Sequence, residues 1–104
     1  MKNELYKENT DLQVTASDLQ EPSLFRVLLL NDDFTPKEFV VAILEKFFFM
    51  DRKKAIEVMM EAQANGMAGC GTFAKDFAEA KISQVIDYAR IHEHPLICSM
   101  EAAV

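Results

Sequence analysis

Three adjacent side chains, Asn31, Asp32 and Asp33, form the first group in this sequence that could do chemistry. Two carboxylates and an amide offer hydrogen-bond acceptors without a positive partner, and such a group suits an ammonium or a hard cation. Asn and Asp are also common in ordinary polar turns, because their side chains bond to nearby backbone groups. The triplet lacks the regular acidic spacing and the glycine of a calcium loop, so it predicts no calcium site.

His92 and His94 form a second candidate group, but two residues apart they do not share a helix face. No further ligand lies at metal-binding spacing, so the pair is typical of a polar helix end. Cys70 and Cys98 fit no zinc spacing and indicate reduced thiols in a cytosolic protein. No serine elbow or glycine-rich loop occurs. We therefore expect no metal, no cofactor and no enzymatic activity.

Composition narrows the function classes further. The chain has 104 residues, enough for one domain. Eleven basic against seventeen acidic residues give a net charge of -6, which disfavours nucleic acid as a partner. No apolar run approaches the roughly 20 residues that span a bilayer, so we expect no membrane insertion. A cytoplasmic monomer is the simplest expectation.

Residues 1–21 differ from the rest of the chain, because only seven of them are apolar and their formal charge sums to -3. We expect a flexible N-terminal tail over 1–21 and a folded core domain over 22–104. A solubilising leader and a segment that a partner grips would both have this composition, and the residues leave both open.

The elements that position the acidic triplet begin with a short apolar strand over 24–30. A helix is expected directly after the triplet. Thr35 is predicted to cap it, Pro36 suits its first position, and Glu38 completes a capping box. Asn31–Asp33 should therefore lie in the turn that joins a strand to a helix.

The later elements are expected in this order: a helix capped by Asp51 and ended by Gly66, a strand over 67–73, a helix from about residue 75, and a strand over 96–101. Phe77 and Val85 belong to the apolar stripe of the third helix. The order β-α-α-β-α-β predicts an α+β fold with two layers, a three-stranded antiparallel sheet packed against three helices.

The stretch from Val27 to Val40, VLLLNDDFTPKEFV, resembles the signature of the ClpS family, adaptors of the Clp protease. Similar residues continue to the end of the core: Leu44 to Phe48, Gly66, Cys70-Gly71, Ala78-Glu79, Lys81 and Glu93 to Cys98. The resemblance covers about residues 22–102 and excludes the tail. It implies a binding module rather than an enzyme.

Adaptors of this family recognise proteins whose first residue is Leu, Phe, Tyr or Trp and deliver them to a hexameric Clp ATPase for degradation. The resemblance assigns binding of the substrate N-terminus to Asn31, Asp32, Asp33, Thr35 and Gln63. It assigns the hydrophobic pocket to Leu29, Leu30, Lys37, Val40, Met59, Ala62 and Leu96. It also implies that Asp76, Glu79 and Lys81 dock on the N-terminal domain of a ClpA-type AAA+ unfoldase, and that the tail takes part in delivery.

Three positions depart from the family pattern. Gln63 stands where a histidine is usual, Lys37 where a methionine is usual, and Ala62 where a larger residue is usual. We expect a broader or shifted set of first residues, and no weakening of binding by acid near pH 6.5, where a histidine would lose its acceptor.

Other functions remain open from the residues. One is a modulator that docks on the Clp ATPase with altered or lost recognition of N-terminal residues. Another is a small domain that docks on a different large protein assembly without binding N-terminal residues. A third is a metal-assisted hydrolase that uses Asp32 and Asp33.

Overall fold

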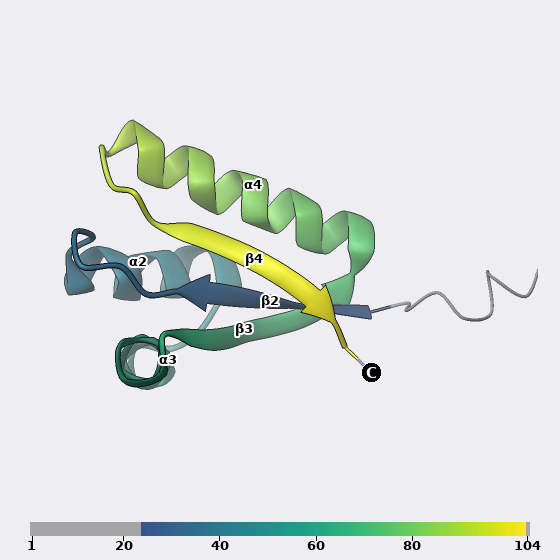
Figure 1. The fold of residues 1–104 in the computed structure, drawn as a ribbon, viewed down its shortest axis with the longest axis horizontal. Helices are drawn as coiled ribbons and strands as arrows, with labels where there is room; N and C mark the ends of the chain where they lie inside the picture. Colours follow the sequence, from purple (N-terminus) through teal and green to yellow (C-terminus); the bar gives the residue numbers. More distant parts are fainter. Residues whose placement is uncertain (1–23, 104) are drawn as a thin grey trace, which may run out of the picture.

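The computed structural model describes residues 24–103, which form one sheet and three helices (Figure 1). The elements in chain order are β2 (Leu24–Leu30), α2 (Lys37–Phe48), α3 (Arg52–Asn65), β3 (Met67–Ala74), α4 (Lys75–Ile91) and β4 (Ile97–Ala102). This order confirms the predicted β-α-α-β-α-β sequence. The expected tail over 1–21 lies outside the described residues.

Strand β2 lies at the centre of the sheet and pairs antiparallel with both β3 and β4. At its carboxyl end Leu30 lies opposite Met67 and Ile97, and at its other end Leu24 lies opposite Ala74. The sheet therefore has two distinct ends. Helix α4 starts at the Leu24 end, directly after Ala74, while the acidic triplet follows Leu30 at the opposite end (Figure 1).

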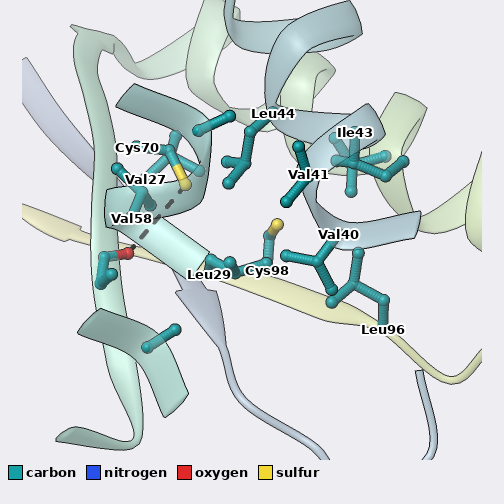
Figure 2. Packing of buried hydrophobic residues seen from close by; sticks show 14 of the residues in the cluster. Val27, Leu29, Val40, Val41, Ile43, Leu44, Val58, Cys70, Leu96 and Cys98 are labelled. Carbon is teal, nitrogen blue, oxygen red and sulfur yellow. Dashed lines mark hydrogen bonds between the residues drawn. The ribbon is translucent and has the colours of Figure 1, made fainter. Parts of the chain in front are cut away.

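The core lies between one face of the sheet and the helices. Alternate residues of β2 face it, and Val27 and Leu29 are almost fully buried there. Leu29 pairs across the strands with Cys98, and Figure 2 shows both side chains in the cluster that includes Val40 and Leu96. The two-layer α+β prediction is confirmed, and Leu29 connects the core to the end of β2 where the triplet begins.

A β-bulge interrupts the pairing of β2 with β3. Val27 lies opposite Gly71 and Leu28 opposite Gly69, so that Cys70 is the extra residue. Gly71 has a φ of 158°, and a Cβ atom there would lie 2.7 Å from the ring of Phe73. Glycine therefore lets the Phe73 ring cover the strand backbone at this position.

The local signals for α3 are confirmed. Asp51 accepts a hydrogen bond from the Lys54 amide at 2.8 Å and caps the helix. Gly66 ends it in the left-handed conformation, with a φ of 91°. These two signals depend only on neighbouring residues, so the sequence was sufficient to find them.

Local predictions at two places are wrong. Thr35 does not cap α2, because its hydroxyl donates to Asp32 instead. Pro36 is the cap residue and not the first helical residue, so the predicted capping box with Glu38 does not form. Phe77 is not buried in the core. It packs against Phe73 at a centroid distance of 5.1 Å and keeps 52% of its surface exposed.

The two cysteines are buried, unpaired thiols in the core. Burial raises the pKa of each to about 12, so neither forms a thiolate at neutral pH. Within residues 24–103, no helix is both long and apolar enough to cross a membrane.

Candidate functional site

The turn between β2 and α2 is held together by Asp32. Its Oδ1 accepts hydrogen bonds from the backbone N–H groups of Phe34 at 2.8 Å and Thr35 at 2.7 Å. Its Oδ2 accepts a bond from the Thr35 hydroxyl at 2.8 Å. The N–H of Asn31 donates to the carbonyl of Gly66 at 2.9 Å, which ties the turn to the end of α3. The acidic triplet therefore has a fixed position between two helices.

The Asp32 carboxylate is stabilised in its charged form. Partial burial disfavours the charge, but the side-chain and backbone hydrogen bonds from Thr35, the bond from the Phe34 N–H and the electrostatic attraction of His94 outweigh it. Together they hold the pKa of Asp32 below its ordinary value of 3.8. Asp32 is therefore ionised at neutral pH. Because Oδ2 has a single partner in the turn, it can accept one more donor.

A cavity of about 160 Å³ opens beside this turn. Its lining comes from β2, the turn, α2, α3 and the segment before β4: Leu29, Leu30, Asn31, Asp32, Asp33, Thr35, Lys37, Val40, Met59, Ala62, Gln63 and Leu96. These are the same twelve residues that the family resemblance assigned to the N-terminus site and the hydrophobic pocket. The structure brings all of them together around one cavity, and their roles in binding stay a prediction.

The cavity has an apolar inner wall and a polar rim. Leu29, Val40, Ala62 and Leu96 line the inner part and are each at most 9% exposed. The polar rim residues with exposed side chains are Asn31, Asp33, Lys37 and Gln63. A ligand that fits this arrangement has an apolar group at one end and a hydrogen-bond donor, preferably a cation, at the other.

Helix periodicity explains how α3 builds one wall of the cavity. Met59, Ala62 and Gln63 are three and four positions apart, so they share one face of the helix. Ala62 is buried and contributes only a methyl group, which leaves room in front of it. Gly66 then ends the helix beside Asn31.

The predicted docking residues Asp76, Glu79 and Lys81 do not belong to the cavity. They lie in the first two turns of α4, at the Leu24 end of the sheet (Figure 1). Asp76 and Glu79 are exposed, and the Lys81 Nζ lies 5.0 Å from the ring centroid of Phe49 and 5.4 Å from that of Phe77. The cavity and this surface therefore occupy opposite ends of the domain.

Sequence reasoning missed the influence of His94 on Asp32. His94 packs edge-on against Phe39 at a centroid distance of 4.4 Å, and no local spacing links it to the turn. His92 agrees with the predicted helix end, because its Nδ1 lies 2.9 Å from the carbonyl oxygen of Tyr88. Among residues 24–103, no three His, Cys, Asp or Glu side chains gather to hold a metal ion.

Comparisons with known proteins identify the family that this chain resembles. A family model described as ATP-dependent Clp protease adaptor protein ClpS matches residues 20–99. Relatives named ATP-dependent Clp protease adapter protein ClpS include one from Aromatoleum aromaticum, 50% identical over 86% of this chain and 88% of its own length. Another, from Caulobacter vibrioides strain NA1000, is 54% identical over 79% of this chain and 75% of its own length.

A solved structure has the same fold. It is described as Agrobacterium tumefaciens ClpS2 bound to L-phenylalaninamide, and it matches with a TM-score of 0.77 and 36% sequence identity. The match covers 80% of this chain and 100% of that one. Sequence and structure comparisons therefore lead to one family.

Proposed function

Because this chain belongs to the ClpS family of adaptors of the ATP-dependent Clp protease, we propose that its cavity binds the first residue of proteins destined for degradation. The Asp32 carboxylate and its neighbours receive the free α-amino group, and the inner wall receives a bulky hydrophobic side chain of the Leu, Phe, Tyr and Trp class. The protein then delivers the bound substrate to the Clp ATPase and so alters which proteins the protease degrades.

One observation carries this proposal: a single cavity joins an ionised carboxylate to a buried apolar wall. A free α-amino group has a pKa of about 7.7 to 8.0 and is mostly an ammonium at neutral pH. Hydrogen bonds to charged groups contribute roughly 1.5 to 3 kcal/mol each, and burial of a Leu or Phe side chain a similar amount. After the cost of association, these terms support a micromolar dissociation constant, or about -8 kcal/mol.

The size of the cavity supports aromatic first residues. A cavity of about 150 Å³ in a protein core holds a benzene molecule, and this one measures about 160 Å³. L-phenylalaninamide, the ligand of the Agrobacterium relative, combines a free amine with a benzyl side chain. The same two groups match the polar rim and the apolar wall described here.

We also propose the finer assignments that follow from family membership. The protein acts by binding and not as an enzyme, as a cytoplasmic monomer with a core domain over 22–104 and a tail over 1–21 that assists delivery. The start of α4, with Asp76, Glu79 and Lys81, docks on the N-terminal domain of a ClpA-type unfoldase. Exposure of the two carboxylates and their distance from the cavity support this docking role.

Fluorescence anisotropy with peptides that differ only at residue one tests the proposal. We expect Leu- and Phe-initiated peptides to bind with micromolar affinity and their acetylated forms not to bind. With Ala62 in the wall, Val- and Ile-initiated peptides should bind better than Gly-initiated ones. Equal binding of free and acetylated peptides would overturn the proposal. Docking on the ATPase without any peptide binding would favour the modulator that has lost N-terminal recognition.

Affinity should not fall as the pH is lowered from 7 to 5.5. The pKa of Asp32 is depressed, so this carboxylate stays charged throughout that range, and Gln63 does not titrate. Above pH 8 the α-amino group loses its proton, and affinity should drop about tenfold by pH 9. Anisotropy titrations from pH 5.5 to 9 measure the affinity in both the acidic and the alkaline range. The Gln63→His variant is the control, since its imidazole should introduce a loss of affinity near pH 6.5. A wild-type loss between pH 7 and 6 would contradict this expectation.

A further inference from the structure

Lys37 places a cation at the rim of the cavity. It lines the cavity and is exposed, and no carboxylate oxygen of residues 24–103 lies within 4.0 Å of its ammonium group. The adjacent acid, Glu38, lies 3.5 Å from Arg52 instead. The charge of Lys37 is therefore available to a ligand.

The position of Lys37 on α2 determines which part of a ligand it meets. Lys37 and Val40 are three residues apart on one helix face, and both line the cavity. Val40 is 9% exposed and belongs to the inner wall, whereas Lys37 lies one turn nearer the helix start and the solvent. We expect a first side chain that packs against Val40 to leave the next residue of the peptide nearer the solvent, on the side where Lys37 lies.

We propose that Lys37 selects substrates with a carboxylate side chain at the second residue. This inference rests on the proposed function of the cavity and adds a second position to what it recognises. The four-carbon stem of lysine lets the ammonium group follow an acidic side chain that leaves the cavity. The start of α2 adds a small positive potential at the same place.

The carboxylate of Asp33 opposes this preference from the same rim. An acidic second residue is therefore favoured only while Lys37 is present, and repulsion by Asp33 should dominate when the lysine is removed. The expected preference is about two- to fivefold, which is typical of an exposed ion pair, and it should shrink at high salt.

A double-mutant cycle tests the proposal with peptides that begin Leu-Glu, Leu-Gln and Leu-Lys and are otherwise identical. In the full chain at low salt, Leu-Glu should bind about two- to fivefold more tightly than Leu-Gln. Lys37→Met should abolish or reverse this ratio, and Lys37→Glu should favour Leu-Lys. Lys53→Met is the matched control, because Lys53 is an exposed lysine in the first turn of α3 outside the cavity. It should keep the wild-type ratio.

Two results would overturn the inference, and they are distinguishable. Equal ratios in the wild type and Lys37→Met, with good binding of all Leu peptides, would remove the role of Lys37 and leave the proposed function intact. Failure of every free N-terminus to bind the wild type would overturn both. Circular dichroism of each variant checks that the fold is retained.

Discussion

Replacing Asp32 by alanine is expected to weaken the binding of a free peptide N-terminus by at least about a hundredfold. The substitution removes the charge that we propose receives the ammonium group, and charge-assisted hydrogen bonds contribute roughly 1.5 to 3 kcal/mol each. It also removes the acceptor of the three bonds that shape the turn. Both losses act on the same ligand group, so the effect should be large. Anisotropy with a Leu-initiated peptide measures it.

Asp32→Asn separates charge from shape. Its side-chain carbonyl can still accept from the Phe34 and Thr35 N–H groups, so the turn should persist. An NH2 group replaces Oδ2, so the ammonium loses both its counter-ion and that acceptor. We expect a loss of about 10- to 100-fold without the disorder of the turn that Asp32→Ala causes. Asp87→Ala is the matched control, an exposed aspartate on α4 that lies 3.6 Å from Arg90. Wild-type affinity in both Asp32 variants would show that the ammonium binds elsewhere.

Replacing Ala62 by leucine should strongly weaken the binding of peptides that begin with an aromatic residue. Ala62 is 2% exposed and lines the cavity, so three added carbon atoms must occupy space that a ring would otherwise use. Loss of the buried side chain costs roughly 1.5 to 3 kcal/mol, and affinity for Phe-initiated peptides should fall about 10- to 100-fold. Peptides that begin with Val should lose less. Anisotropy with the two peptides gives the ratio.

Ala64→Leu is the control for this experiment, because Ala64 is an exposed alanine of the same helix outside the cavity. It adds the same atoms and should leave every affinity unchanged. The melting temperature of Ala62→Leu should not fall, since the added atoms occupy the empty cavity that Ala62 lines. Unchanged binding of Phe-initiated peptides by a folded Ala62→Leu protein would show that the first side chain does not enter this cavity.

The elements of the fold follow from short-range patterns, and the sequence was sufficient to predict them. The apolar run Leu24–Leu30, the Asp51 cap and the left-handed Gly66 each depend on neighbouring residues. Thr35 shows where this reasoning fails. A capping box and a bond to Asp32 compete for one hydroxyl, and the structure has the bond to Asp32. The local sequence allows either interaction of the Thr35 hydroxyl and does not show which of the two is more stable.

The cavity depends on contacts between distant parts of the chain. Leu29 and Leu96 come from different ends of the sequence, and no periodicity in either segment links them. The family resemblance supplied that association, and the fold brings the residues together. No sequence pattern connected His94 with Asp32, and only the folded structure shows that His94 lowers the pKa of Asp32. The bulge at Cys70 likewise needs knowledge of strand register.

The separation between the cavity and the start of α4 has a consequence for the substrate protein. Strand β2 has seven residues, and at about 3.3 Å per residue it holds the two sites roughly 20 Å apart. If the ATPase docks at the start of α4 as proposed, a substrate whose first residue lies in the cavity must extend past the Leu24 end of the sheet to reach it. An extended N-terminal segment of at least about six or seven residues spans that distance. A substrate whose first residues belong to its folded domain should therefore bind in the cavity but not reach the ATPase for unfolding.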